Sequence, residues 1–307
     1  MHECMLYKKL SGGSVRCDTC AHHCVIKPGS RGFCGVRENR SGALYSLVYG
    51  KAAAVNVDPI EKKPLFHFMP GSLSFSVCTA GCNMRCKNCQ NYTLSQIEDC
   101  NDLPGGYDVK PESIAASALE HGCRTVSYTY TEPAVFFDYA RDISAHAAEK
   151  GLKNIFVTNG FWSEKALKKI LPFMHGANVD LKAFRESTYH DLCGARLQPV
   201  LDTIIRMAQA GIWLEITTLI IPDINDSEQE LKEIAAFIRS VSCDIPWHVS
   251  RFHPSYKMNH FKPTSVLDLK KARDIGLDAG LKYVYTGNIP GDNGESTFCP
   301  QCGLMLI

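Results

Sequence analysis

A regular alternation of β-rich runs with longer stretches of helical periodicity constrains the fold of this chain more than any other feature. The alternation begins near residue 72, and Gly, Pro or Asn turn signals bound its segments. We expect strands at residues 72–77, 125–130, 154–160, 177–182, 213–221, 246–252 and 283–287. We expect helices at residues 111–122, 134–150, 163–173, 199–210, 227–241 and 265–279. Because such alternation is typical of a parallel sheet covered by helices, the sequence predicts an α/β fold, a partial (β/α)6 barrel of the TIM type.

The regions outside the alternation are rich in cysteine and divide the chain into three parts. We expect a cysteine-rich N-terminal extension at residues 1–60, the barrel at residues 61–290, and a C-terminal tail with a C-x2-C pair at residues 291–307. The chain has 15 cysteines. Because this number is odd, and because 307 residues can bury a core without disulfide staples, the cysteines indicate metal ligation in a reducing compartment.

The charge balance and the hydropathy exclude several classes of partner. The 33 Lys and Arg residues exceed the 32 Asp and Glu residues by one, so no overall positive field attracts a nucleic acid or an anionic membrane surface. No apolar run approaches the roughly 18 residues that a membrane helix needs. The first residues also lack the apolar stretch of a secretory signal. We therefore expect a cytoplasmic protein that binds neither nucleic acid nor a membrane.

Three cysteines, Cys82, Cys86 and Cys89, follow the first expected strand with C-x3-C-x2-C spacing. Thiolates are the ligands of iron-sulfur clusters. A 4Fe-4S cluster usually takes four of them, so three leave one iron open, and an open position is typical of a catalytic metal site. The loop would lie at the carboxyl end of a strand, where α/β folds place their active sites. The alternatives are a zinc knuckle and a four-cysteine cluster that adds Cys78.

Two further cysteine groups have ligand spacing. The N-terminal group has C-x2-C-x3-C-x9-C spacing and consists of Cys17, Cys20, Cys24 and Cys34. Four thiolates complete a tetrahedral zinc site or fully ligate a second iron-sulfur cluster, so we expect a closed structural site, with a cluster that relays electrons as the functional alternative. In the tail, Cys299 and Cys302 supply half of a zinc knuckle. They would complete a site by joining cysteines of the N-terminal extension, which would bring the two ends of the chain together.

Several longer segments resemble one enzyme family. They are CDTCAHHC…GFCGVR (17–37), KKPLFHFMPGS (62–72), GCNMRCKNCQN (81–91), YTYTEP (128–133), VTNG (157–160), DLKAF (180–184), PWHVSRFHPSYKM (246–258) and TGNIPG…CPQCG (286–303). In this order they resemble the radical S-adenosylmethionine (radical SAM) superfamily and its pyruvate formate-lyase activating enzyme-like branch. Within that branch the chain is most similar to the radical SAM protein of the AmmeMemoRadiSam system, and the resemblance covers nearly the whole chain.

The resemblance implies a 4Fe-4S cluster on Cys82, Cys86 and Cys89, whose open iron is chelated by S-adenosylmethionine (SAM). Glu132, with Thr131 before it, stands where the family's Gly-Gly-Glu-Pro motif receives the methionyl ammonium of SAM. A carboxylate opposite an ammonium forms a charge-assisted hydrogen bond. A helix N-terminal acid beside a proline is the structural alternative for Glu132.

Other strand ends carry further candidate SAM contacts. Alternation places Asp180 and Lys182 on one face of their strand, and the resemblance implies that Asp180 faces the ribose and Lys182 the carboxylate of SAM. A surface ion pair is the alternative for these two residues. The resemblance also implies that Thr158 and Asn159 help to place the cofactor. It places His253 where the activating enzymes carry a cofactor-contacting histidine.

Besides Thr131, which replaces a glycine of the family motif, the chain departs from the family beside the third cysteine. Many members have an aromatic residue near the adenine, just before the third cysteine, where this chain has Asn88; Tyr92 is the candidate replacement. Matching segments also suggest a substrate-facing rim that consists of His67, Trp247, His248 and Tyr256.

These features predict a radical SAM enzyme. It would cleave SAM reductively, generate a 5′-deoxyadenosyl radical and abstract hydrogen from a protein or small molecule that the sequence does not identify. A flavodoxin- or ferredoxin-type protein would supply the electron, and no acid–base catalytic residue is expected because the cofactor carries the chemistry. One alternative is an activase that installs a glycyl radical on a partner enzyme. An alternative of another class is a non-catalytic iron-sulfur electron carrier or a zinc-binding interaction protein.

Overall fold

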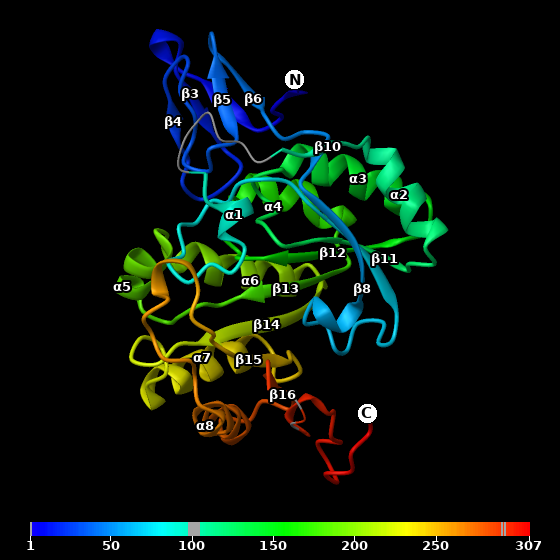
Figure 1. The fold of residues 1–307 in the computed structure, drawn as a ribbon, viewed down its shortest axis with the longest axis vertical. Coiled ribbons are helices and arrows are strands. Elements are labelled where there is room, and N and C mark those ends of the chain that lie inside the picture. The colour runs from blue at the N-terminus through cyan, green and yellow to red at the C-terminus, as the bar shows by residue number, and fades with distance from the viewer. Residues whose placement is uncertain (1, 98–104, 290, 292) are drawn as a thin grey trace.

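The computed structural model describes residues 2–97, 105–289, 291 and 293–307, and its body is one eight-stranded sheet (Figure 1). The strand order is β16-β15-β14-β13-β12-β11-β9-β8. In chain order the strands are β8 (Ala54–Pro59), β9 (Leu73–Cys78), β11 (Thr125–Tyr128), β12 (Lys153–Thr158), β13 (Gly176–Asp180), β14 (Trp213–Ile220), β15 (Trp247–Arg251) and β16 (Val284–Gly287). All neighbours pair in parallel except β8 and β9, which are antiparallel. The expected α/β fold with a partial barrel is confirmed.

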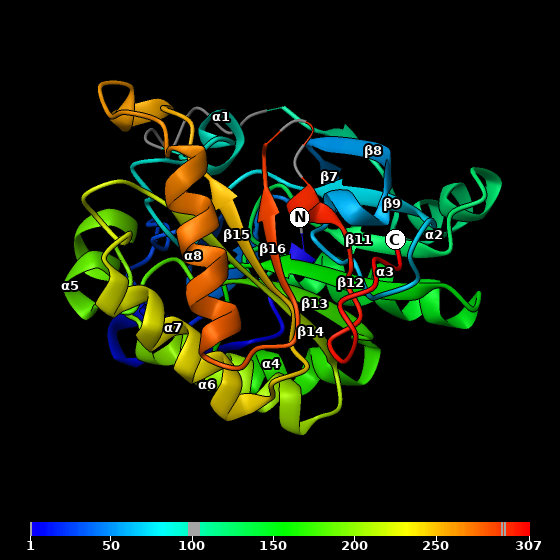
Figure 2. The same ribbon diagram turned by 90° about the horizontal axis from the view of Figure 1, so that it is seen from below.

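Helices cover the outer face of this sheet, as the view from below shows (Figure 2). They are α2 (Pro111–Glu120), α3 (Phe137–Glu149), α4 (Glu164–Ile170), α6 (Gln198–Gln209), α7 (Glu228–Val241) and α8 (Val266–Asp278), with the short α1 (Tyr92–Ser95) and α5 (Glu186–Thr188) in loops. Ser163, Ser227 and Ser265 each accept a hydrogen bond from a backbone N–H of the first turn of α4, α7 and α8, which stabilises each helix start. In the part of the chain that the structure describes, no helix has the length and apolar composition to cross a membrane.

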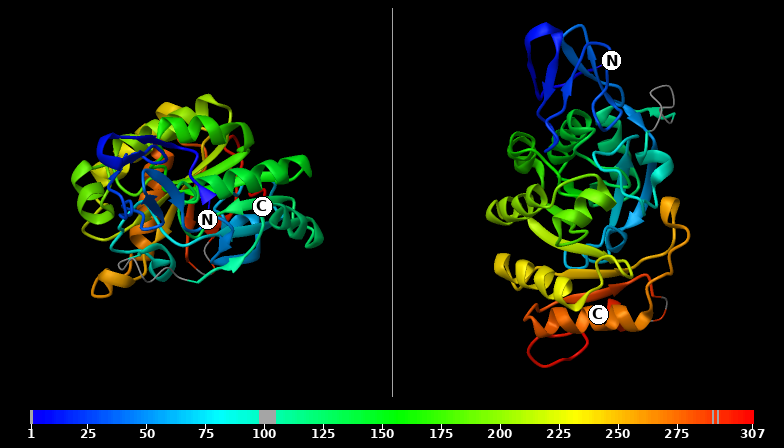
Figure 3. Two further views of the ribbon diagram at one scale, coloured as in Figure 1. Left: turned by 90° about the horizontal axis from the view of Figure 1, so that it is seen from above. Right: turned by 90° about the vertical axis from the view of Figure 1, so that its left-hand side faces the viewer.

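Small antiparallel sheets precede the barrel and form a separate layer at one end of the molecule (Figure 3, right). Their strands are β1 (His2–Glu3), β2 (Tyr7–Lys9), β3 (Val15–Cys17), β4 (Val25–Ile26), β5 (Arg37–Arg40) and β6 (Ala43–Ser46); a further pair consists of β7 (Lys51–Ala52) and β10 (Tyr107–Asp108). The expected boundary at residue 60 falls just after β8, which is the edge strand of the barrel sheet. The tail lies beyond β16, at the opposite end of the molecule (Figures 1 and 3).

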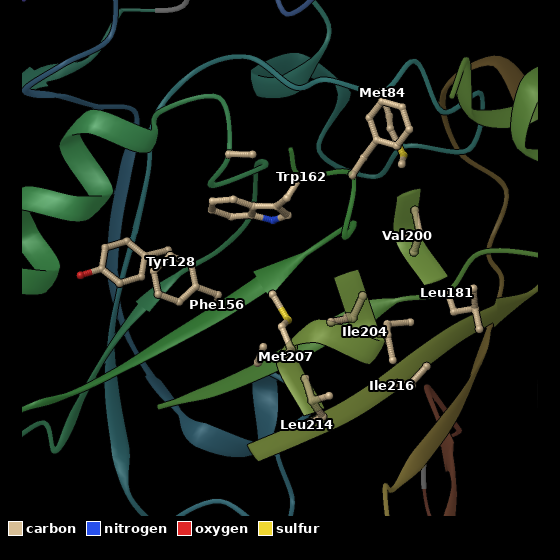
Figure 4. Close-up of a cluster of buried hydrophobic side chains, with 14 of the residues drawn as sticks. Met84, Tyr128, Phe156, Trp162, Leu181, Val200, Ile204, Met207, Leu214 and Ile216 are labelled. Carbon is tan, nitrogen blue, oxygen red and sulfur yellow. The ribbon is translucent and has the colours of Figure 1, made fainter. Parts of the chain in front are cut away.

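A continuous apolar core joins the sheet to its helices (Figure 4). Phe156 of β12 stacks on Tyr128 of β11, and both side chains are fully buried. Met84, which belongs to the loop with the three cysteines, is also fully buried in this core. The core therefore anchors the cysteine loop as well as the barrel.

The interior of the barrel near the amino ends of the strands is filled by the segment that follows β8. Glu215 of β14 accepts hydrogen bonds from the backbone N–H groups of Phe66 and His67 at 3.0 and 2.9 Å. The same carboxylate lies 2.7 Å from Nε2 of His248, and both side chains are buried. Trp247 is buried as well. The expectation of a substrate-facing rim is wrong for Trp247 and His248, because both side chains are buried: alternation turns His248 toward Glu215 and Phe66, and Trp247 toward Gly276 of α8.

Candidate functional site

The carboxyl ends of neighbouring parallel strands and the cysteine loop enclose a cavity of about 370 Å3. Parallel strands end at one edge of a sheet, so residues far apart in sequence meet there. Of the expected site residues, the cavity is lined by Cys82, Cys86, Cys89, Thr131, Glu132, Thr158, Asn159, Asp180 and Lys182. The structure thus brings the three-cysteine loop and the candidate SAM contacts of β11, β12 and β13 to one place.

Backbone contacts from two other segments hold the cysteine loop in position. On one side, the N–H of Arg85 donates to the carbonyl of Cys193 at 2.7 Å, and the N–H of Lys87 donates to the carbonyl of Leu192 at 3.0 Å. These acceptors belong to a π-helical turn, Tyr189–Cys193, a local geometry that often marks functional sites. On the other side, Nε2 of His22 lies 2.8 Å from the carbonyl oxygen of Asn83.

The three thiols form a donor set that fits an iron-sulfur cluster. Cys82 Sγ accepts from the N–H of Met84 at 3.4 Å and from Nδ2 of Asn159 at 3.7 Å. Burial raises the pKa of Cys82 and of Cys89, whereas a hydrogen bond from the buried Cys193 lowers the pKa of Cys86 to about 7. Within the described residues, no group of three or more Cys, His, Asp or Glu side chains surrounds a single metal ion. A cluster, whose thiolates bind different irons, does not require such convergence.

Glu132 is buried at the end of β11 and faces the cavity. Its carboxylate accepts from Thr158 Oγ1 at 2.7 Å, from the N–H of Asn159 at 2.8 Å and from the N–H of Ala134 at 3.0 Å. Burial nevertheless dominates and raises the pKa of Glu132 to about 7. A carboxylate in this position gains from a cationic ligand, because a nearby positive charge stabilises its ionised form.

Asp180 and Lys182 form an ion pair on the cavity wall, with 2.9 Å between Oδ2 and Nζ. Their side chains are 35% and 22% exposed, so the pair is neither fully buried nor an ordinary surface contact. Burial alone would lower the pKa of Lys182. The negative charges of Asp180 and of the Cys86 and Cys193 sulfurs outweigh burial, and the net effect is a raised pKa. The pair offers one anion and one cation to a zwitterionic ligand.

A polar cluster that the sequence did not reveal reaches the cavity through Lys63 and Tyr130. Lys63 is 2% exposed and its Nζ lies 2.7 Å from Asp58 Oδ2, which also accepts from Tyr130 Oη at 2.5 Å. Burial would raise the pKa of Asp58, but these hydrogen bonds outweigh it and lower the pKa to about 2. Tyr130 has a φ of +62°, a left-handed conformation that is uncommon for a bulky residue and tends to occur at functional sites.

Some candidates lie outside this cavity. His253 is exposed and is not among the lining residues. Tyr92 stacks on Tyr256, with 4.7 Å between ring centroids, and does not line the cavity either. Asn88 does line it, and its Oδ1 is buried without a hydrogen-bond partner among the described residues. An amide acceptor therefore stands just before the third cysteine, where the resemblance implies an aromatic ring.

The other cysteine groups occupy different ends of the molecule. The four N-terminal cysteines line a second, smaller cavity. Cys299 and Cys302 lie in the tail beyond β16 (Figures 1 and 3). The expectation that the tail joins the N-terminal cysteines is wrong, because β16 is the far edge strand and directs the tail away from the N-terminal layer.

The family is decided by a match between residues 76–238 and the family model for the radical SAM superfamily. The chain belongs to the radical SAM superfamily. A relative from Methanocaldococcus jannaschii, described as an uncharacterized protein, is 44% identical over 308 residues, which cover 100% of this chain and 91% of the relative. The matched segment contains the three-cysteine loop and the carboxyl ends of β11, β12 and β13. Radical SAM proteins use a 4Fe-4S cluster and SAM. The three thiols described above fit such a cluster, and the cavity beside them contains carboxylates and a lysine that fit a zwitterionic ligand.

Solved radical SAM structures share the fold. SuiB from Streptococcus suis, bound to S-adenosylmethionine, has a TM-score of 0.55 at 16% identity over 71% of this chain and 51% of SuiB. A radical SAM methyltransferase from Sphaerobacter thermophilus has a TM-score of 0.54 at 14% identity over 71% of this chain and 67% of the methyltransferase. The chain thus spans about half the length of SuiB. At these identities the similarity extends to the fold alone.

Sequence reasoning missed Lys63, which lines the radical SAM cavity, and Cys193, which lies beside the cysteine loop. Lys63 lies in residues 62–72, one of the segments that resemble the family, but nothing in that segment indicates that the Lys63 side chain reaches the cavity. Cys193 has no ligand spacing, yet its buried thiol hydrogen-bonds to that of Cys86. Only the tertiary pairing of the π-helical turn with the cysteine loop reveals that contact.

Substitution of Gly81 by alanine should both destabilise the protein and displace the cysteine loop. Gly81 has a φ of +98°, and an added Cβ would lie 2.7 Å from Val36 Cγ1 and 3.0 Å from the carbonyl oxygen of Cys34. Gly122 has a φ of +67° but nothing within 4 Å of its Cβ position. Gly122→Ala should cost only the left-handed penalty of about 1–2 kcal/mol. Gly81→Ala should lower the free energy of unfolding by about 1–3 kcal/mol more than Gly122→Ala, because the added methyl group overpacks the site. Urea unfolding measures this difference. Gly81→Ala should also lower iron uptake. Equal losses in the two variants would contradict this account of the loop.

Acidification should remove the stability that Asp58 contributes. The pKa of Asp58 is about 2 in the folded protein, against an ordinary value of 3.8. The contribution is therefore complete above about pH 4 and is lost as the pH falls from 4 toward 2, by about 2 kcal/mol. Asp58→Asn should be less stable at neutral pH, and its deficit relative to the unsubstituted protein should shrink over that range in urea unfolding. Asp108→Asn, at an exposed ion pair, is the control. A deficit of Asp58→Asn that stays constant from pH 5 to 2 would overturn the role of the carboxylate charge.

Proposed function

We propose that this radical SAM protein is an enzyme that binds a 4Fe-4S cluster through Cys82, Cys86 and Cys89, cleaves SAM reductively and abstracts hydrogen from a substrate. The observation that carries the proposal is the single cavity that these cysteines share with Glu132 and the Asp180–Lys182 pair. Bound at these residues, a reduced cluster and SAM would together supply the chemistry: one electron would cleave a carbon–sulfur bond of SAM to give methionine and a 5′-deoxyadenosyl radical. The protein's own residues then have to bind SAM, orient it beside the cluster and exclude water from the cavity.

Glu132 is proposed to receive the methionyl ammonium of SAM. The hydrogen bonds from Thr158 and from the N–H of Asn159 fix the carboxylate in orientation. Because burial has already removed water from Glu132, an ammonium beside it would form a charge-assisted hydrogen bond at little further desolvation cost.

Lys182 is proposed to meet the carboxylate of SAM and Asp180 its ribose hydroxyls. The 2.9 Å ion pair holds both side chains on the cavity wall before the ligand arrives, so less side-chain entropy is lost on binding. Asn88 is proposed to replace the aromatic adenine contact of many relatives. Its buried, unpartnered Oδ1 supplies an acceptor, and the adenine amino group is a donor that matches it.

The finer assignments rest on sequence motifs. We propose that the chain is the radical SAM member of the AmmeMemoRadiSam system, that a flavodoxin- or ferredoxin-type protein reduces its cluster, and that its substrate is a protein or a small molecule. Residues 246–258 and the N-terminal cysteine segment are among the segments that carry this resemblance. A non-catalytic electron carrier would not need a cavity of about 370 Å3 beside its cluster, which argues for the enzyme.

Replacing any cysteine of the loop should abolish the chemistry. Cys82→Ala, Cys86→Ala and Cys89→Ala should each lose bound iron after anaerobic reconstitution and release no 5′-deoxyadenosine from SAM under reduction, measured by chromatography. Cys78→Ala is the matched control, because Cys78 is a fully buried thiol at the end of β9 that does not line the cavity. Full turnover in a loop variant would remove the cluster assignment, and loss of the cluster in Cys78→Ala would favour a four-cysteine site.

Lys182→Met should weaken SAM binding while leaving iron content and the cluster spectrum unchanged. Removal of one partner from a desolvated charge contact costs about 2–5 kcal/mol, which corresponds to roughly 30-fold or more in affinity. Lys51→Met is the control, because the 2.6 Å contact of Lys51 with Asp108 is exposed and such pairs contribute about 1 kcal/mol or less. Titration of the reconstituted variants with SAM measures both. Unchanged affinity in Lys182→Met would exclude Lys182 from the site.

A further inference from the structure

A second cavity, apart from the radical SAM cavity, is lined by the four spaced cysteines of the N-terminal extension, Cys17, Cys20, Cys24 and Cys34. It has a volume of about 20 Å3. Cys17 and Cys34 are 6% and 8% exposed, and Ile26, Val135 and Ala134 form apolar walls. Strand β3 and the loops on either side of β4 bring the four thiols together from both halves of the segment 17–34. The arrangement brings together four soft ligands, of which Cys17 and Cys34 are buried and Cys20 and Cys24 are partly exposed.

On the wall of this cavity, one nitrogen of the buried Arg37 side chain lacks a hydrogen-bond acceptor. Arg37 is 2% exposed; its Nε donates to the carbonyl of Val135 at 3.2 Å and its Nη2 to Asp138 at 2.9 Å. Its Nη1 is buried without a hydrogen-bond partner among the described residues. A buried donor without a partner is costly. A negatively charged ligand set at the cysteines would supply the missing acceptor.

We propose that Cys17, Cys20, Cys24 and Cys34 bind one zinc ion in a closed, structural site. Four thiolates in a tetrahedron around Zn2+ are an established closed arrangement of structural zinc sites. The size of the cavity separates zinc from a second cluster, because about 20 Å3 accommodates roughly one water-sized sphere and not a cube of four irons and four sulfides. As the side chains stand, the thiols do not surround a single ion, so binding turns them inward about their Cα–Cβ bonds.

The surroundings of the cavity complement the charge of such a site. Zinc with four thiolates carries two net negative charges. Lys165 and Arg16 both bind the single carboxylate of Asp18, next to Cys17. Arg196 donates to the carbonyl of Ala21 at 2.7 Å, and Arg85 donates to the carbonyl of Phe33. Cations thus exceed carboxylates around the segment 17–34, which favours an anionic centre inside it.

The zinc site positions the cysteine loop of the radical SAM cavity. His22, between Cys20 and Cys24, contacts the carbonyl of Asn83 at 2.8 Å. Phe33, next to Cys34, accepts from Arg85 and lies under its guanidinium. A metal that fixes the segment 17–34 therefore fixes a surface against which the loop rests, without taking part in the radical chemistry.

Metal analysis of the full-length protein and of the triple variant Cys82→Ala, Cys86→Ala, Cys89→Ala tests the proposal. Both proteins, produced with zinc and iron in the medium, should contain one zinc per chain by mass spectrometry. X-ray absorption at the zinc edge should give four sulfur ligands at about 2.3 Å. The triple variant separates this site from the radical SAM cluster, so a failed cluster assignment does not affect the result.

Single variants identify the ligands. Cys24→Ser should lose most of the zinc, whereas Cys4→Ala should retain it, because Cys4 is a buried thiol of the same extension that does not line the cavity. If Cys24→Ser does not fold, cobalt substitution of the unsubstituted protein decides through the absorption of a tetrahedral four-thiolate site. The proposal is overturned if the triple variant retains iron with acid-labile sulfide, if it folds without metal, or if fewer than four sulfurs surround the zinc.

Discussion

The radical SAM cavity depends on the clamping of the cysteine loop between two other segments. Gly81 lies so close to Val36 and Cys34 that no side chain fits, and Arg85 is tied through its backbone to Cys193 on the opposite side. The buried side chain of Met84 fixes the middle of the loop in the barrel core. Because the loop itself contains little regular structure, these contacts set the distance of its thiols from the strand ends.

The charged groups of the cavity are arranged in pairs before any ligand binds. Asp180 faces Lys182, and Asp58 faces Lys63, so buried or half-buried charges are partly compensated in the protein itself. Glu132 is the exception, because burial dominates its surroundings. A ligand with an ammonium group supplies what Glu132 lacks, which is the physical reason for placing the amino end of SAM there.

The sequence predicted the parallel sheet, its helices and the residues at the strand ends, because alternation, turn residues and the cysteine spacing are local signals. It could not place His253, which is exposed, because the direction of a loop after a strand depends on tertiary packing. Lys63 and Cys193 were missed for the same reason. The tail was wrongly joined to the N-terminal cysteines, since spacing contains no information on which edge of the sheet a segment leaves. The small N-terminal strands are too short for periodicity to show.

Mössbauer spectroscopy of the protein reconstituted with 57Fe, with and without SAM, tests the central claim most directly. In the proposed site, three cysteine ligands leave one iron of a 4Fe-4S cluster open, and Glu132, Asp180 and Lys182 are proposed to hold SAM beside that iron. The account therefore predicts that SAM changes the signal of one iron in four and leaves the other three unchanged, and that this change weakens in Lys182→Met. Four equivalent irons whose spectrum does not respond to SAM would contradict it.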